Sequence, residues 1–177
     1  MCCASVPDLD KSSAIPDTAP SRATFAAGCF WGIQEVFSGV PGVIATRVGY
    51  TGGHWSHPTY DEVCSDATGH AEAVEIQYDP ALVSYQDLLT HFWACHDPTL
   101  LNRQGPDIGS QYRSAIFCHD EAQSQAARAS MAEQQASGRY RRPLVTEIVP
   151  AGPFWEAEAY HQHYLRRTGK TKGCSFR

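Results

Sequence analysis

Apolar residues recur along the chain in short runs that predict an alternation of strands and helices. Runs rich in alanine, β-branched and aromatic residues predict strands, whereas apolar residues three or four positions apart predict amphipathic helices. The expected strands cover residues 23–28, 42–50, 71–80, 112–118 and 144–149. The expected helices cover 30–37, a segment opening at the Ser84–Asp87 capping box, an Ala-rich segment between Asp120 and Gly138, and a last segment after Pro153 that carries 155–165.

These elements alternate irregularly and show no internal repeat, which indicates the α+β class. We expect a mixed β-sheet with helices packed on it, in a two-layer ferredoxin-like sandwich core. Residues 23–177 are expected to form a single domain. Residues 1–22, rich in Pro, Ser and Asp, are typical of a disordered tail, and 166–177 of a flexible C-terminal segment.

Composition narrows the functional classes. The 177 residues, 42% of them hydrophobic, suffice for one domain with a substantial core. A formal net charge of −5 gives no reason to expect nucleic-acid binding, and no apolar run reaches the roughly 18 residues that indicate a membrane span. Seven cysteines are too few for a disulfide scaffold and indicate a reducing compartment, for which we expect the cytoplasm.

The segment GCFWG, residues 28–32, places a cysteine between a glycine and two aromatic residues. Glycines weaken strand and helix interiors, so Gly28 and Gly32 indicate a turn where a strand gives way to a helix. The dipole and the unpaired amides at the start of that helix would favour the thiolate of Cys29 and lower its pKa toward neutrality. This context fits a reactive cysteine better than a buried structural one.

Glu72 is the second candidate, because it falls on the apolar side of a predicted strand. The even-numbered residues 72–78 share that face by the period of two, and Glu75 and Gln77 share the other face, which we expect to be exposed to water. Desolvation on the apolar face would raise the pKa of Glu72 and keep it protonated, ready to donate a proton. A salt-bridged structural glutamate is the alternative.

Two long loops, 51–64 and 96–111, contribute further candidates. Loops longer than about 12 residues in a compact domain are usually functional or disordered, and aromatic residues argue against disorder. Tyr60, Asp107 and Tyr112 lie in or beside these loops. Taken alone, each of the three fits packing better than catalysis.

Several motifs together resemble the peptide methionine sulfoxide reductases of type A, over residues 24–165. The motifs are GCFWG, GYTGG, PTYDEVC, TGHAE, HDPT, NRQGPDIGSQYRS and HQHYL, and they occur in the family's order with near-family spacing. The resemblance implies an enzyme that reduces methionine-S-sulfoxide, free or in oxidised proteins and peptides, to methionine in protein repair. It implies no metal or bound cofactor, and thioredoxin or a similar dithiol protein as electron donor.

The resemblance also implies roles for the residues of the GCFWG segment. Phe30 and Trp31 would form the walls that hold the methyl group of the substrate. Cys29 would attack the sulfoxide sulfur, and after methionine leaves it would remain as a sulfenic acid. The aromatic residues beside the cysteine are thereby explained as a binding site for a side chain that is polar at oxygen and apolar at its methyl group.

The same resemblance implies an oxygen-binding group made of the other candidates. Glu72 would bond the sulfoxide oxygen and protonate it as a general acid, helped by the hydroxyl groups of Tyr60 and Tyr112. Asp107 would orient this network rather than transfer the proton. Asp66 departs from the family's pattern, in which a glycine is common at that position.

The return of Cys29 to its thiol needs a partner, because a sulfenic acid condenses readily with a nearby thiol. Cys64, Cys95 and Cys118 are expected in a loop, a helix and an apolar strand. Cys174 lies in the flexible, basic C-terminal segment, where lysines and arginines would favour its thiolate. We therefore expect a Cys29–Cys174 disulfide as the intermediate that thioredoxin reduces.

Three alternatives from other classes remain. A cysteine peptidase or similar thiol hydrolase would pair Cys29 with His161 or His163, although the one asparagine, Asn102, precedes both histidines. A zinc deaminase would share the H-x-E pattern of residues 70–72, although the chain has no C-x-x-C motif. A module that binds oxidised peptides without turnover would keep the aromatic residues but leave Glu72 without a purpose.

Overall fold

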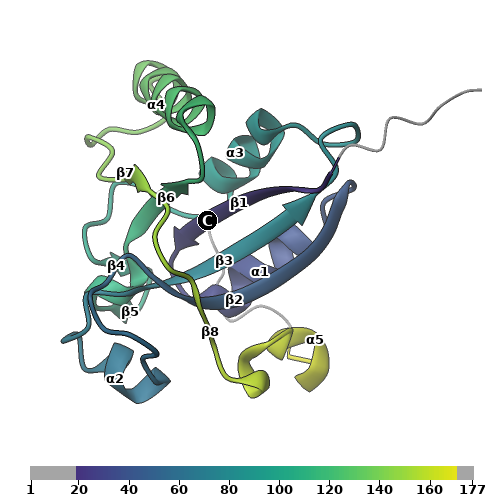
Figure 1. Ribbon diagram of the computed structural model, residues 1–177. Helices are drawn as coiled ribbons and strands as arrows, with labels where there is room; N and C mark the ends of the chain where they lie inside the picture. Colours follow the sequence, from purple (N-terminus) through teal and green to yellow (C-terminus); the bar gives the residue numbers. More distant parts are fainter. Residues whose placement is uncertain (1–18, 171–177) are drawn as a thin grey trace, which may run out of the picture.

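Six strands form one mixed sheet in the order β7-β6-β1-β3-β2-β8 within residues 19–170, the part of the chain that the computed structural model describes (Figure 1). The strands are β1 Ser21–Ala27, β2 Val43–Thr51, β3 Ala71–Tyr78, β6 Ser114–Cys118, β7 Glu147–Pro150 and β8 Trp155–Glu156. Neighbouring strands are antiparallel except β6 and β7, which are parallel. The predicted mixed sheet is confirmed.

The longer helices of the described chain are α1 Phe30–Ser38, α3 Tyr85–Ala94 and α4 Glu121–Ala136. The central elements follow the chain order β1-α1-β2-β3-α3-β6, which is the β-α-β-β-α-β order of a ferredoxin-like unit. Helices α1 and α3 pack against the central strands, and α4 packs beside α3 (Figure 1). The α+β class is therefore confirmed.

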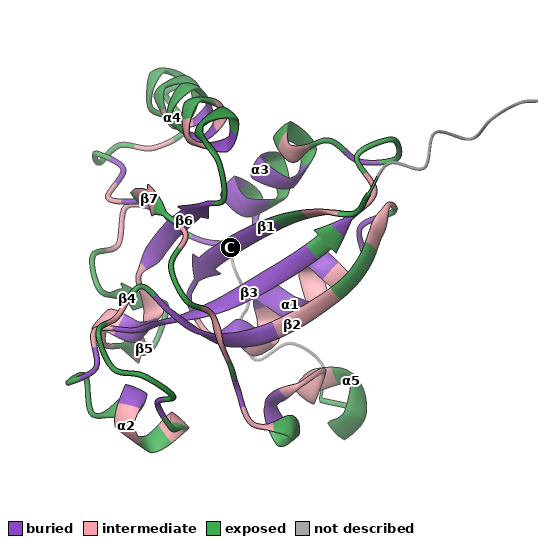
Figure 2. Ribbon diagram, in the orientation of Figure 1, coloured by how far each residue is buried: buried purple, intermediate pink, exposed green. Residues whose placement is uncertain are grey.

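The main core lies between these helices and the sheet. The ring of Phe25 in β1 lies 5.4 Å from that of Phe37 in α1 and 5.1 Å from that of Phe92 in α3. All three side chains are fully buried, and Figure 2 shows most of β1 and β3 buried as well. Burial of such a side chain contributes about 1.5–3 kcal/mol, so the core holds α1 firmly against β1 and β3.

A second, smaller cluster lies on the opposite face of the sheet. It consists of Ala26, Ala71, Ala73, Ala115 and Phe117. The segment between β7 and β8 crosses this face in Figure 1, and its residues Ala151 and Phe154 pack on the cluster. The small alanine side chains allow this segment to lie close to the strands.

The expectation that Glu75 faces water is wrong. Glu75 is 5% exposed, and one of its carboxylate oxygens lies 2.8 Å from the guanidinium of Arg47 on the neighbouring strand. Arg47 in turn lies over the ring of Phe154, 5.0 Å from its centroid. Glu75 is thus buried beneath a half-exposed Arg47 and the covering segment, which the alternation along one strand could not reveal.

The predicted last helix over 155–165 is also wrong. Trp155 and Glu156 form the edge strand β8, which pairs with Tyr50 and Gly49 of β2. Two short helical elements follow, η2 Ala159–His161 and α5 Tyr164–Thr168. The open edge of β2 offers backbone hydrogen bonds that compete with the local helical preference of this segment, and only the tertiary fold brings the two together.

The two long loops contain short elements that the sequence analysis missed. The first holds α2 Tyr60–Cys64, which starts with a capping box between Thr59 and Glu62, so Cys64 ends a helix rather than lying in a loop. The Thr-x-x-Glu pattern could have indicated this start. The second holds the hairpin β4 Arg103–Gln104 and β5 Asp107–Ile108, followed by η1 Ser110–Tyr112.

The chain enters the sheet at Ser21, two residues before the expected start of the domain. Residues 1–18 and 171–177, including Cys174, lie outside the described residues, so the expected tails stay predictions. None of the helices within the described chain is long and apolar enough to cross a membrane.

Gly49 should be intolerant of any side chain, because β8 passes directly over it. A Cβ atom there would lie 2.3 Å from the carbonyl oxygen of Trp155 and 2.5 Å from the ring of Phe154. We expect Gly49→Ala to lower the free energy of unfolding by about 1–3 kcal/mol. Urea denaturation measures this effect.

Gly152→Ala is the matched control, since a Cβ at Gly152 meets no heavy atom within 4 Å. It should change the free energy of unfolding by less than about 0.5 kcal/mol. Equal stabilities of the Gly49→Ala variant and the wild-type chain would show that β8 does not bind β2 as closely as the structure has it.

Candidate active site

Cys29 lies where β1 ends and α1 begins, as predicted. It is the N-cap residue of α1, and it is partly exposed. Gly28 before it has a φ of +96°, which an L side chain rarely adopts, and a Cβ there would lie 2.7 Å from the side chain of Gln104. Glycine is therefore required twice, by the turn and by the close approach of Gln104.

Glu72 joins this turn to the sheet. Its Oε2 accepts a hydrogen bond from the backbone N–H of Phe30, the residue after Cys29, at 3.0 Å. The side chain is 2% exposed. Burial raises the pKa of Glu72 to about 8, reinforced by the nearby charge of Asp107 and opposed by the Phe30 hydrogen bond. The predicted inward position of Glu72 is confirmed by this burial, and its pKa is shifted in the predicted direction.

The other candidates gather around this carboxyl group from the short elements of the two long loops, Tyr60 from α2, Asp107 from β5 and Tyr112 from η1. Burial raises the pKa of Tyr60 and of Tyr112, and the charge of Glu72 contributes to both shifts. The charges of Asp107 and Cys29 also act on Tyr112, so both groups lie within electrostatic reach of it. Burial raises the pKa of Asp107 as well. The fold thus brings together Cys29, Glu72, Tyr60, Tyr112 and Asp107, which are far apart in the sequence.

Asp66 links two of these loops. Its carboxylate accepts hydrogen bonds from the backbone N–H and the hydroxyl of Ser110, the first residue of the η1 turn that carries Tyr112. Asp66 has a φ of +63°, a conformation that glycine adopts at no steric cost and that Asp tolerates better than most residues. The carboxylate bonds stabilise this conformation, and they fix the loop after α2 to η1.

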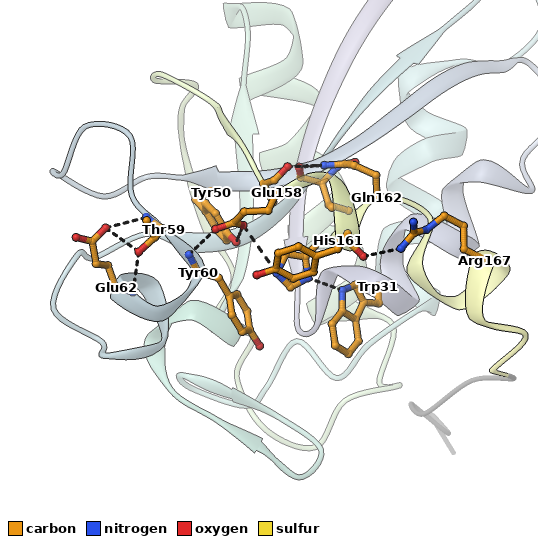
Figure 3. Close-up of polar contacts among 12 residues, drawn as sticks. Trp31, Tyr50, Thr59, Tyr60, Glu62, Glu158, His161, Gln162 and Arg167 are labelled. Atoms are coloured by element: carbon orange, nitrogen blue, oxygen red, sulfur yellow. Dashed lines mark hydrogen bonds and ion pairs between the residues drawn. The ribbon is translucent and has the colours of Figure 1, made fainter.

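Trp31 lies on the first turn of α1, held on two sides by the C-terminal segment. Its indole Nε1–H donates a hydrogen bond to Nδ1 of His161 at 2.9 Å (Figure 3). Its ring stacks on Tyr164, with centroids 4.0 Å apart and planes 17° apart. The His161 ring also lies 5.2 Å from that of Phe30 and 4.5 Å from that of Tyr60, measured between centroids. His161 therefore contacts three of the predicted site residues.

Glu158 forms a second link from the C-terminal segment to the site. Its two carboxylate oxygens accept hydrogen bonds from the backbone N–H of Tyr60 and from the hydroxyl of Tyr50, both at 2.9 Å (Figure 3). Burial opposes its ionisation, but these bonds and backbone donors keep the pKa of Glu158 below its usual value. Tyr50 pairs with Glu72 across β2 and β3, so this link reaches the strand that carries the buried carboxyl.

The sequence analysis assigned no role to His161, Glu158 or Tyr50 in this arrangement. His161 stood out only in the HQHYL motif and as a candidate partner of a peptidase cysteine. Tyr50 stood out only as part of the GYTGG motif, and no local pattern marks Glu158, whose contacts with Tyr50 and Tyr60 join positions about 100 residues apart. The pairing of β8 with β2 brings Glu158 to the site.

The structure places the other described cysteines differently from one another. Cys95 and Cys118 are buried, at the C-cap of α3 and at the end of β6. Cys64 is exposed and lies within electrostatic reach of Tyr60, next to the site. Burial nevertheless raises the pKa of Cys64, against the effect of Tyr60. Residues 19–170 hold no cluster of His, Cys, Asp and Glu suited to a metal ion.

A cysteine at a helix start, a protonated buried carboxyl group and two phenols around it define a thiol-dependent enzyme site. The family comparison gives this class a name. The sequence model of the family "Peptide methionine sulfoxide reductase" matches residues 21–177. The chain belongs to the peptide methionine sulfoxide reductase family, and it is an oxidoreductase.

Relatives and solved structures agree with this assignment. "Peptide methionine sulfoxide reductase MsrA" of Geobacter sulfurreducens is 61% identical, over 86% of this chain and 94% of the relative. The enzyme of that name from Methanoculleus marisnigri is 58% identical, over 87% and 94%. The crystal structure of reduced Mxr1 from Saccharomyces cerevisiae superposes with a TM-score of 0.82 at 32% identity, covering 88% of this chain and 89% of that one.

The raised pKa of Glu72 predicts that this residue makes stability depend on pH. The unfolded chain ionises Glu72 near its ordinary pKa of 4.5, whereas the folded chain keeps it protonated up to about 8. Between these values the folded state binds more protons, so stability falls as the pH rises. Because glutamine does not titrate, Glu72→Gln should equal the wild-type chain in stability near pH 5 and exceed it by up to a few kcal/mol near pH 8.

Urea denaturation of both proteins across this pH range measures the difference. Glu75→Gln on the same strand is the control, because it removes a carboxylate paired with Arg47 and should destabilise the protein at pH 8. Parallel stability curves for Glu72→Gln and the wild-type chain would contradict a buried neutral Glu72.

Proposed function

We propose that this chain reduces methionine-S-sulfoxide, free or in oxidised proteins and peptides, to methionine by attack of Cys29 on the sulfoxide sulfur. The observation that supports this most strongly is the hydrogen bond between Glu72 and the backbone N–H of Phe30. It holds a carboxyl group that is still protonated near neutral pH next to the residue that carries the thiol. A sulfoxide needs both groups, because its oxygen leaves only when protonated.

In the proposed reaction, the thiol of Cys29 supplies the electrons and the carboxyl group of Glu72 supplies the proton. The sulfur of Cys29 forms a bond to the sulfoxide sulfur, while Glu72 donates a proton to the oxygen. The oxygen is transferred to Cys29 as the substrate's sulfur–oxygen bond and the new sulfur–sulfur bond both break, and methionine leaves with the two electrons that the thiol has supplied. Cys29 ends as a sulfenic acid, and Glu72 regains its proton from the thiol by way of solvent.

The neighbouring side chains supply binding and orientation. The hydroxyl groups of Tyr60 and Tyr112 are protonated at neutral pH, because a phenol's ordinary pKa is about 10 and burial raises both pKa values further, so both can donate to the sulfoxide oxygen. Burial is the main cause of the raised pKa of Glu72, and the charge of Asp107 adds to it. Phe30 and Trp31 form the apolar wall for the methyl group, and the shape of this wall discriminates between the two epimers at sulfur.

Regeneration requires an external dithiol. The family neighbour Mxr1 has been crystallised in complex with Trx2, and we propose thioredoxin or a similar protein as the electron donor here. The chain needs no bound cofactor for this chemistry, because both electrons come from thiols. The small number of cysteines fits a reducing compartment, and we propose the cytoplasm.

The peptidase alternative receives no support from the geometry. A thiol hydrolase needs a histidine free to take the proton of the cysteine, with its other nitrogen held by an orienting group. His161 Nδ1 instead accepts the indole hydrogen bond of Trp31. The ring lies against Phe30, Tyr60 and Tyr160 within an aromatic cluster.

The proposed activity predicts half conversion of a racemic methionine sulfoxide peptide with dithiothreitol. The opposite epimer would aim its oxygen at the apolar wall and leave a polar group unbonded, at a cost of roughly 1–3 kcal/mol or more. Chiral chromatography of the product mixture measures this. Cys29→Ser should be inactive, and Glu72→Gln should be slower by about 10²–10⁴-fold. Complete conversion of both epimers, or an active Cys29→Ser variant, would refute the proposed site.

Cys174 is proposed as the cysteine that resolves the sulfenic acid, on the basis of its position in the C-terminal segment. Cys174→Ser should release one methionine per enzyme but fail to cycle with thioredoxin. Cys64→Ser is the control, because its raised pKa makes Cys64 a poor thiolate despite its place beside Tyr60. Mass spectrometry after one turnover without reductant identifies the bridge. A Cys29–Cys64 bridge, or normal cycling of Cys174→Ser, would overturn the assignment.

A further inference from the structure

His161 occupies the centre of the aromatic cluster behind the site, although the proposed reaction gives it no chemical step. It is 1% exposed, and four rings lie within 6 Å of it between centroids, namely those of Phe30, Trp31, Tyr60 and Tyr160. Among its neighbours, Trp31 and Tyr60 come from different helices, α1 and α2. A single residue therefore touches both the methyl wall and one of the oxygen-binding phenols of the proposed site.

The hydrogen bond to Trp31 determines which nitrogen of His161 carries the proton. An indole N–H can only donate, so Nδ1 must accept and the hydrogen of the neutral ring must be on Nε2. Nε2 has no hydrogen-bond partner within the described residues, and Glu158 Oε2 lies 3.8 Å away, too far for a hydrogen bond. Burial lowers the pKa of His161, although Glu158 opposes this, so the ring remains a neutral acceptor at neutral pH.

We propose that His161 is a positioning residue that holds the indole of Trp31 in the orientation needed to bind the substrate's methyl group. This inference rests on the proposed function and extends it to the C-terminal segment. The bond to Nδ1 fixes the rotation of the indole about its side-chain axis, and the stack on Tyr164 fixes its plane. Without the acceptor, the part-buried indole N–H of Trp31 would turn to find another partner and would move the wall that Trp31 and Phe30 form.

The expected effect of His161 on catalysis follows from the role of the apolar wall of Phe30 and Trp31, which contacts the methyl group of the substrate. An apolar wall contacts the methyl group equally in the bound substrate and in the transition state, so it contributes uniform binding. Loss of uniform binding raises KM and leaves kcat largely unchanged. A residue that merely stabilises the fold would instead lower the amount of active enzyme without changing KM.

Two substitutions of His161 separate the acceptor from the rest of the ring. His161→Asn keeps an oxygen acceptor near the position of Nδ1, whereas His161→Gln carries its amide near the position of Nε2 and leaves the indole without a partner. We expect His161→Gln to raise KM for a methionine-S-sulfoxide peptide about 10-fold or more, with kcat changed less than about threefold. His161→Asn should remain within about threefold of the wild-type KM.

Ser130→Ala is a matched control at a remote site. The indole N–H of Trp93 donates to the Ser130 hydroxyl at 2.9 Å, and both residues are buried between α3 and α4. Like His161→Gln, this variant removes the acceptor of an indole N–H, so it should also lower the urea midpoint. It should leave KM unchanged, since Trp93 is not part of the proposed site.

The indole N–H signal of Trp31 in a ¹H–¹⁵N spectrum provides a readout that needs no substrate. Four tryptophans limit the number of signals, and Trp31→Phe identifies the one required. The signal should move upfield in His161→Gln and stay near its wild-type position in His161→Asn. If the wild-type chain reduced no sulfoxide, the proposed function would fail, but this signal would still test the bond.

Two results would overturn the proposal. One is an unchanged Trp31 signal or an unchanged KM in a folded His161→Gln protein. The other is an equal loss of stability and activity in the Asn and Gln variants, which would show that His161 only fills space. The combination of a raised KM, a shifted indole signal and rescue by Asn supports the positioning role.

Discussion

The hydrogen bond from the Phe30 backbone to the buried Glu72 carboxyl group is the contact on which the site depends. It joins the start of α1 to β3, and so it fixes the position of Cys29 relative to the acid. The bond would be stronger with an ionised carboxylate, yet burial outweighs it and keeps Glu72 protonated to about pH 8. The same burial has two consequences: Glu72 can donate a proton at neutral pH, and the folded state becomes less stable as the pH rises.

The core of aromatic side chains stabilises the hydrogen bond between Phe30 and Glu72. Phe25, Phe37 and Phe92 pack α1 and α3 on the sheet, so the first turn of α1 cannot move away from β3 to admit water. Phe30 extends this packing toward the site, where its ring lies 5.9 Å from that of Tyr50 between centroids. The low polarity that raises the pKa of Glu72 is therefore produced by the same residues that hold the fold together.

The C-terminal segment completes the site from the far edge of the sheet. After crossing the alanine-lined face, it pairs with β2 as β8 and then presents Glu158, His161 and Tyr164 to the helices that carry Tyr60 and Trp31. A short strand of two residues thus controls a large part of the site. The close contact over Gly49 explains how so short a strand is held in register.

The sequence by itself determined the helix-start cysteine, the inward side of Glu72, the class of fold and the family. These depend on short-range signals, such as the glycines around Cys29 and the period of two along β3, or on motifs read in order. The tertiary structure alone decided that residues 155–156 form a strand, that Glu75 is buried and paired with Arg47 of the neighbouring strand, and that His161 and Glu158 support the site. Each of these rests on contacts between segments far apart in the chain, whose energies exceed local preferences and leave no periodic trace in the sequence.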